Sequence, residues 1–117
     1  MNIRPPRIKY NDPNDFGPTI FRDSDRRAVE SLGHTVIDNE YRSASGWLKF
    51  KDDVPEHKDG FGRCWVYCAG GKGVLREEGE EPRTLTPGSH IVFDDRNMHS
   101  FQVTAKPCYL LVVNIED

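Results

Sequence analysis

Four side chains of types that bind metals or transfer protons lie beside two glycine-containing turns. His57, Asp59 and Cys64 fall within one short segment, and His99 follows a second. Two imidazoles with one thiolate suit zinc, copper or iron, and two imidazoles with one carboxylate suit non-haem iron(II). A metal held there would act as a Lewis acid or bind an oxygen species. These residue types could therefore hold one transition metal, iron or zinc, and His99, Cys64 and Asp59 are also candidate catalytic residues.

The same residues have simpler explanations that stay open at this point. His57 belongs to a polar stretch, residues 56–60, that could be a solvated loop. Cys64 could be a small buried apolar residue, or a thiol nucleophile if a neighbouring histidine lowers its pKa. His90 is out of phase with its apolar neighbours and is expected to point outward, as is Cys108.

Alternation of apolar and polar residues with a period of two dominates the chain after His34 and predicts strands joined by turns. Between residues 61 and 69 it places Cys64, Val66 and Cys68 on one face. Gly70–Gly73 is expected to form a hairpin turn before a return strand. The remaining expected strands cover residues 34–41, 45–51, 89–93, 99–103 and 109–115. The pattern predicts an all-β barrel or sandwich of about eight strands.

The first third of the chain has a different character. Four prolines among residues 1–20 predict an extended arm, and residues 23–33 predict a short helix with Asp23 or Ser24 as its N-cap and Gly33 at its end. We expect a single domain over residues 1–117. Residues 1–33 would form the arm and short helix, and residues 34–117 the β-barrel.

Composition excludes several classes of function. The chain has 117 residues and a formal net charge of −3, with no basic patch of the kind that binds nucleic acid. No apolar run is long enough to span a membrane, and the basic N-terminus is not followed by the apolar core of a secretory signal. The cysteine count of three is odd. We expect a cytoplasmic protein with reduced thiols that binds neither nucleic acid nor membranes.

The spacing of the chemical residues resembles the two motifs of the cupin superfamily. That family has His-x-His, three or four residues, Glu, six residues and Gly; here the segment reads His57-x-Asp59, four residues, Cys64, six residues and Gly71. The second motif has a Gly well upstream of a final His, as Gly88 precedes His99. The resemblance covers roughly residues 45–115. It implies a cupin-type jelly-roll β-barrel, with the family's four ligand positions at His57, Asp59, Cys64 and His99.

Within the cupins, residues 66–101 are most similar to ectoine synthases. The shared features are the Val66-Tyr67-Cys68 strand, the Pro87-Gly88 turn and an aspartate five residues before His99. This resemblance implies a homodimeric enzyme that closes a ring by eliminating water with an iron centre. The family's Glu, Tyr and His ligands fall on Cys64, Ile91 and His99, and its substrate-lining positions on the last strand fall on Leu111 and Val113.

Three functions follow as hypotheses. The first is a metal-dependent lyase or cyclase, or an isomerase, that acts on a small polar metabolite. The second is a cupin-type iron oxygenase, and the third is a non-catalytic cupin that binds a small molecule. The predicted substrate-binding residues are Trp47, Ile91, Phe93, Phe101 and Tyr109, which could line the barrel cavity or simply fill it.

Overall fold

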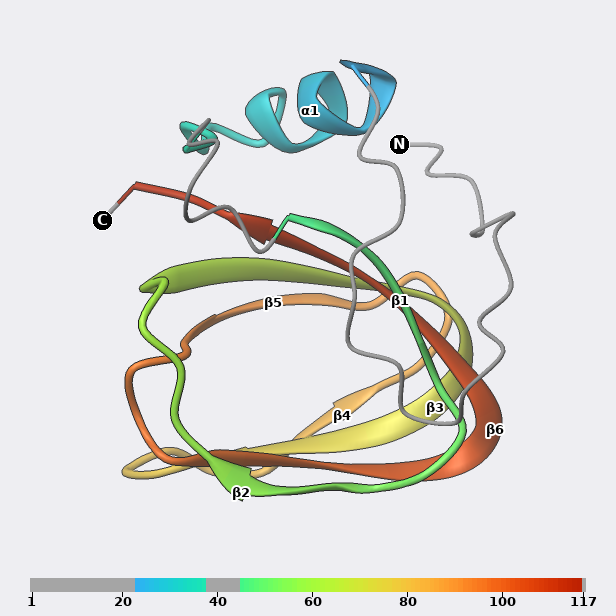
Figure 1. Cartoon of the computed structure of the whole chain (residues 1–117). Helices are drawn as coiled ribbons and strands as arrows, with labels where there is room; N and C mark the ends of the chain where they lie inside the picture. The colour runs from blue at the N-terminus through green and yellow to red at the C-terminus, as the bar shows by residue number, and fades with distance from the viewer. Residues whose placement is uncertain (1–22, 38–44, 117) are drawn as a thin grey trace.

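The computed structural model describes residues 23–37 and 45–116, which contain one helix and six strands (Figure 1). These elements are α1 (Asp23–Glu30), β1 (Gly46–Phe50), β2 (Val54–His57), β3 (Arg63–Glu77), β4 (Arg83–Leu85), β5 (His90–Asp94) and β6 (His99–Asn114). The expected arm over residues 1–22 and the end of the expected strand 34–41 lie outside the described residues. Within 34–37, only an isolated bridge from Val36 to Ile115 is strand-like.

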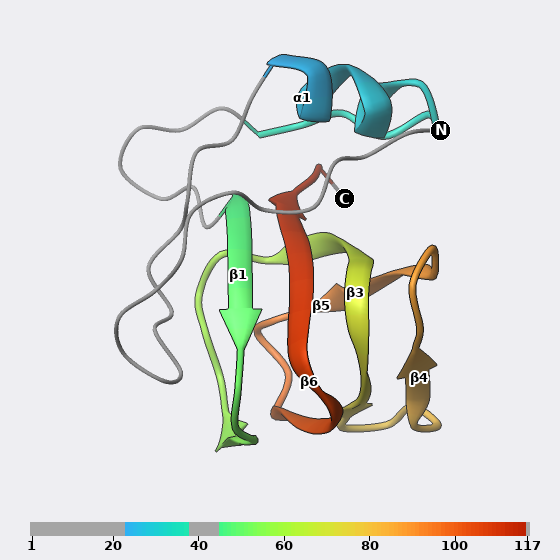
Figure 2. The same cartoon turned by 90° about the vertical axis from the view of Figure 1, so that its right-hand side faces the viewer.

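Two long, bent strands organise the sheet. The first half of β3 pairs with the second half of β6 through Cys64↔Asn114, and the second half of β3 pairs with the first half of β6 through Glu77↔His99. β1 and β5 flank the first of these pairs, and β2 and β4 flank the second. The result is two antiparallel layers that face each other, with β3 and β6 curving from one layer into the other (Figures 1 and 2).

This arrangement confirms a mostly β fold with one short helix and corrects two expectations. The described strands do not close into a barrel. Their hydrogen-bonded order runs from β1 through β6 and β3 to β4, while β2 pairs with β6 and β5 pairs with β3, so no pairing joins the two ends of the order. The hairpin predicted at Gly70–Gly73 is wrong, because β3 runs continuously through these glycines. The strands expected at 99–103 and 109–115 are likewise one strand, β6.

Gly71 explains why a glycine-rich segment bends here without reversing the chain. Its φ is +71°, and a Cβ at this position would lie 2.2 Å from the carbonyl oxygen of Pro107 on β6. The pairing register shifts three times between Cys68 and Gly73. Such irregularities bend a strand and increase its twist, so β3 turns the corner between the layers without leaving the sheet.

The space between the layers holds the main apolar cluster. Alternate residues of β3, Cys64, Val66 and Cys68, point into it, as the sequence pattern predicted. Phe101 and Leu110 of β6 join them. Cys108 also belongs to this cluster and is fully buried, so the expectation that it faces outward is wrong.

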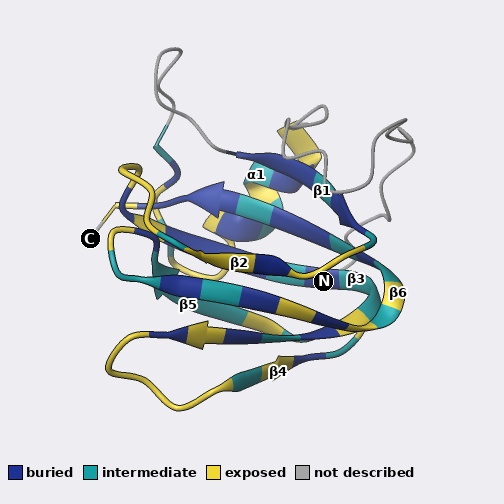
Figure 3. Ribbon diagram, turned by 60° about the horizontal axis from the view of Figure 1, so that its bottom comes forward, coloured by how far each residue is buried: buried dark blue, intermediate teal, exposed yellow. Residues whose placement is uncertain are grey.

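A second apolar cluster lies on the outer side of one layer, beneath α1. Trp47, Trp65 and Leu111 are almost completely buried there, with Val29 of the helix against them. Figure 3 shows α1 with both buried and exposed residues over the sheet. The indole Nε1 of Trp47 donates a hydrogen bond of 3.2 Å to Asp25 of α1. The last apolar run of the chain is therefore buried on both faces, because one face meets the helix and the other meets the interior.

The helix ends near the predicted glycine. The last helical residue is Glu30, and Gly33 follows with a φ of +94°, a conformation common where helices terminate. No helix among the residues the structure describes has the length and apolar character needed to cross a membrane.

Candidate metal centre and pocket

Three of the four predicted ligands come together at one edge of the inter-layer space. The Nε2 atom of His57 lies 3.2 Å from Oδ2 of Asp59, and Nε2 of His99 lies 3.5 Å from the same oxygen. The potential ligand atoms of these three residues all lie within 4.8 Å of one another. They provide two imidazoles and one carboxylate, a donor set typical of non-haem iron(II) and also compatible with zinc.

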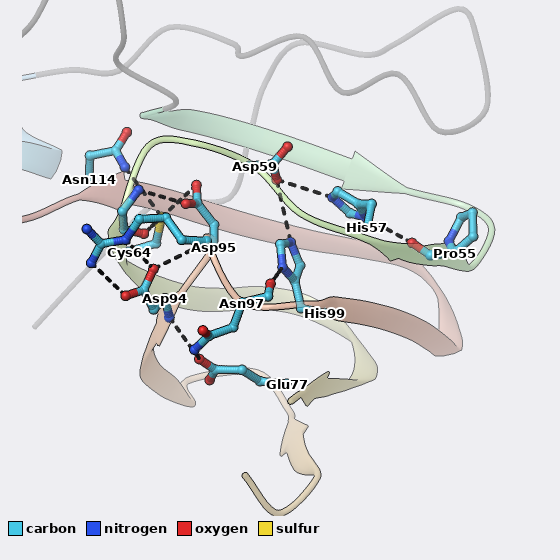
Figure 4. A network of polar contacts seen from close by, with 12 residues as sticks. Pro55, His57, Asp59, Cys64, Glu77, Asp94, Asp95, Asn97, His99 and Asn114 are labelled. Carbon is cyan, nitrogen blue, oxygen red and sulfur yellow. Dashed lines mark hydrogen bonds and ion pairs between the residues drawn. The ribbon is translucent and has the colours of Figure 1, made fainter. Parts of the chain in front are cut away.

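The backbone fixes which nitrogen of each imidazole faces this point. Nδ1 of His57 lies 2.9 Å from the carbonyl oxygen of Pro55, and Nδ1 of His99 lies 2.8 Å from that of Asn97 (Figure 4). A carbonyl oxygen only accepts hydrogen bonds, so both Nδ1 atoms must carry the proton. In the neutral ring, Nε2 then has no proton and its lone pair is directed at Asp59. Histidines that bind metals commonly donate their other ring N–H to a backbone carbonyl in the same way.

Strand pairing positions the two histidines, and a turn positions the carboxylate. His57 of β2 is directly opposite His99 of β6 in the sheet register. Asp59 follows β2, where its backbone N–H donates to the carbonyl oxygen of Asp95 at 2.8 Å. The ends of β2 and β5 and the start of β6 therefore meet at the site.

A buried ion pair supports the turn that precedes His99. Glu77 of β3 pairs with Arg83 and also accepts hydrogen bonds from the backbone N–H of Asp94, at 3.2 Å, and from the Asn97 side chain, at 2.9 Å. The Glu77 side chain is only 5% exposed. Asn97 also supplies the carbonyl oxygen that orients His99. Glu77 therefore supports the site indirectly, by holding Asn97 in place.

A pocket of about 600 Å³ opens beside the three residues. Its walls are mostly aliphatic and aromatic side chains from both layers, and the polar groups gather at the end that holds His57, Asp59 and His99. The His99 side chain is 7% exposed, whereas those of His57 and Asp59 are each 40% exposed. The site therefore lies where the pocket meets solvent.

Cys64 lines the pocket but stands apart from the group of three. Its sulfur lies 3.6 Å from the carbonyl oxygen of Gly62 and 3.8 Å from Oδ2 of Asp95, and it accepts a hydrogen bond from Asn114 at 3.4 Å. Burial and the nearby Asp95 charge raise the pKa of the Cys64 thiol far above its usual value. Cys64 does not belong to the group of three whose ligand atoms lie within 4.8 Å of one another, and its roles as metal ligand and catalytic residue stay predictions.

Asp95 is a buried polar pocket residue that the sequence analysis did not single out. It is 3% exposed and lines the pocket. Its Oδ1 accepts a hydrogen bond of 2.7 Å from the Gly62 N–H, and burial raises the pKa of its carboxyl group. The adjacent aspartates, Asp94 and Asp95, differ sharply in surroundings, because the Arg96 guanidinium lowers the pKa of the outward-facing Asp94. In sequence both look like turn residues.

The predicted substrate-binding residues divide between the two faces of the sheet. Phe93 and Phe101 line the pocket. Ile91 packs against the interior cluster without lining the pocket. Tyr109 covers Gly70 and lies under Lys49 on the outer side. Trp47 is buried beneath the helix.

Leu111 and Val113, the positions taken from the ectoine synthase resemblance, also lie in the cluster beneath the helix. Their neighbours Leu110 and Val112 line the pocket instead. Because side chains of a strand alternate between faces, a shift of one residue in the alignment exchanges the two sets.

Comparison with known proteins finds similar folds among solved structures but no similar sequence. No family model matches the sequence, and no curated protein is significantly similar to it. Solved structures are similar at low identity. A cupin superfamily protein from Desulfitobacterium hafniense is 16% identical with a TM-score of 0.56, over 72% of this chain and 76% of the other.

Two further structures extend this likeness. A cupin-2 domain protein from Shewanella frigidimarina is 14% identical with a TM-score of 0.53, over 77% of this chain and 91% of the other. A candidate mannose-6-phosphate isomerase from Ralstonia eutropha is 15% identical with a TM-score of 0.55, over 72% and 83%. Identities this low concern the fold alone, and they do not favour ectoine synthases over other cupins. The chain therefore has the fold of the cupin superfamily.

Proposed function

We propose that this protein is a metal-dependent enzyme that converts a small molecule held in the inter-layer pocket. The observation that carries the proposal is the convergence of His57 Nε2, His99 Nε2 and Asp59 Oδ2, with both Nδ1 atoms bonded to backbone carbonyls. Two lone pairs and a carboxylate oxygen this close repel one another, and either a metal ion among them or protons on the two Nε2 atoms removes that repulsion. Imidazole and carboxylate donors fit a divalent transition metal.

The surroundings favour a catalytic metal site over a structural one. Structural zinc sites use four protein ligands, whereas catalytic sites have three and leave a position for water or substrate. Here three ligands lie at the mouth of a pocket, and the fourth predicted ligand, Cys64, is not among the residues that come together. When bound, the metal would polarise an oxygen atom of the substrate.

The chain's own residues supply the rest of the chemistry. His57 and His99 would hold the metal and Asp59 would complete the set, while the apolar walls would contact the rest of the bound molecule. Asp95 is a buried carboxyl group of the pocket outside the metal set, able to take up or return a proton. These parts suit cyclisation with loss of water or isomerisation, because both reactions need a polarised oxygen and a moved proton.

An iron oxygenase is the second candidate, and one specific observation favours it. Two histidines and one carboxylate are the ligand set of non-haem iron(II) oxygenases, which keep open positions for oxygen and substrate. Requirement for oxygen separates the two candidates.

The test is a screen for turnover with and without oxygen. Purified protein loaded with iron(II) or with zinc is incubated with a mixture of small metabolites, and mass spectrometry follows which compounds change. His99→Ala is the matched negative. A compound converted by the wild type in both atmospheres, and not by the variant, supports the lyase or isomerase. Conversion only in oxygen supports the oxygenase, and retention of a compound without conversion would replace both with a binding module.

We also propose that the protein is a homodimer, as the resemblance to small dimeric cupins implies. The described sheet order ends at β1 and β4, and exposed strand edges in natural proteins are commonly covered. A monomer mass in solution would contradict this proposal.

A further inference from the structure

The pocket lining carries acidic side chains without lysine or arginine among the described residues. Among the described residues that line it, the acidic ones are Glu56, Asp59 and Asp95, and none is lysine or arginine. Asp59 is accounted for by the metal site, and Glu56 is exposed at the mouth. Asp95 is the buried carboxylate, and the proposed metal centre does not use it.

Asp95 has one oxygen in a strong hydrogen bond and one oxygen with only a weak contact. Oδ1 receives the Gly62 N–H at 2.7 Å, which holds the carboxylate in a fixed orientation. Among the described residues, the contact recorded for Oδ2 is the Cys64 thiol at 3.8 Å, too long for a strong hydrogen bond. Asp95 as a whole residue is only 3% exposed. A buried carboxylate oxygen without a strong donor lowers the stability of the fold unless a ligand supplies that donor.

The rest of the pocket indicates the shape of that ligand. Leu48, Phe50, Val66, Leu85 and Val112 are among the walls, so most of the ligand must be apolar. We propose that the pocket binds a small amphipathic molecule whose head group donates a hydrogen bond, an amine or a hydroxyl, to Oδ2 of Asp95. Any reaction of this ligand depends on the proposed function, whereas its binding to Asp95 does not. It replaces the polar metabolite expected from the sequence with a mainly apolar one.

The same lining disfavours anionic head groups. Phosphates and carboxylates are usually held by arginine, lysine or several N–H donors. Without the proposed metal, the described lining offers no lysine or arginine, and Asp95 would repel an anion placed beside it. In the metal-free pocket, a phosphorylated sugar, the substrate class named for one structural neighbour, would therefore bind poorly.

Two probes of equal length and opposite head group test the proposal. Calorimetry would measure the binding of hexylamine and of hexanoate to the wild type and to Asp95→Asn, each in metal-free and zinc-loaded form. The asparagine can keep its Oδ1 bonded to Gly62 and place an NH₂ donor where Oδ2 was. Asp94→Asn is the matched control, because Asp94 lies next in sequence, does not line the pocket and pairs with Arg96.

In the metal-free wild type, hexylamine should bind at least about tenfold more tightly than hexanoate. Asp95→Asn should reduce this ratio about tenfold or reverse it, and Asp94→Asn should leave it unchanged. An unchanged ratio in Asp95→Asn, a preference for hexanoate in the metal-free wild type, or binding of neither probe would overturn the proposal. The zinc content of the same samples tests the metal centre separately, so a protein that prefers the amine but holds no zinc would contradict only the proposed function.

Discussion

His57 and His99 face each other across the β2–β6 pair, with ring centroids 4.4 Å apart. Each ring bonds through Nδ1 to the carbonyl two residues before it, at Pro55 and Asn97 respectively. The orientation of both imidazoles is therefore set by local backbone, and their distance is set by strand register. A metal centre built in this way needs little rearrangement to receive its ion.

Glu77→Ala is predicted to destabilise the fold and weaken the metal site. The change leaves Arg83 and Asn97 without their shared partner, and Arg83 is 27% exposed, so we expect a loss of about 2–3 kcal/mol in the free energy of unfolding. Metal affinity should fall about tenfold or more, because Asn97 loses its support. Urea unfolding and chelator competition measure the two effects.

Arg76→Ala is the control for this prediction, because Arg76 is an exposed neighbour on the same strand that bonds to Gln102. Its effect on stability should stay within about 0.5 kcal/mol. Equal stability of Glu77→Ala and Arg76→Ala would show that the buried ion pair does not support the turn.

Gly71→Ala is predicted to disrupt the corner between the layers. The new Cβ would lie 2.2 Å from the Pro107 carbonyl oxygen, at a φ of +71°, so we expect a loss of about 3 kcal/mol or more. Gly79→Ala separates the two causes, because Gly79 has a φ of +83° and nothing within 4 Å of its Cβ position. It should cost only about 1 kcal/mol. Similar thermal unfolding of both variants would contradict the close approach of β3 to β6.

Cys64 predicts a dependence of stability on alkaline pH. Its pKa is raised in the folded protein, so the folded state retains the thiol proton at a pH where the unfolded chain has lost it. Stability from this group is complete below the unfolded thiol's pKa, about 8.5, and falls as the pH rises above it.

Cys64→Ala should therefore make the alkaline decline in unfolding free energy shallower, by up to about 1.4 kcal/mol per pH unit. Urea unfolding between pH 7 and 10 would measure the slopes. Equal slopes in the two proteins would show that Cys64 ionises as easily folded as unfolded.

Much of the fold could be predicted from the sequence because period-two alternation is a local signal. It placed Cys64, Val66 and Cys68 on one shared face, and the structure shows that this face points into the interior. It could not distinguish a hairpin from a bend at Gly70–Gly73, since glycines permit both. The choice depends on the approach of Pro107, far along the chain.

Part of the candidate site was also predictable, because the spacing of residues within a motif is likewise a local signal. His57, Asp59 and His99 came from motif spacing, and the structure brings them together. Asp95 gave no signal, because its burial depends on the path of the turn after β5 and its hydrogen bond to Gly62. Trp47 and Tyr109 looked like pocket residues because aromatic character does not reveal which face of a sheet a residue occupies.

The most direct test of the central claim is the metal content of protein purified without a metal-binding tag. Elemental mass spectrometry would compare the wild type with His99→Ala, and with His90→Ala as the control, because His90 is exposed and stacks near Trp65 outside the site. We predict close to one iron or zinc per chain in the wild type and in His90→Ala, and almost none in His99→Ala, with all three folded by circular dichroism. Folded wild-type protein that takes up neither iron nor zinc when either is supplied, or a His99→Ala variant that retains the metal, would contradict the proposed metal centre.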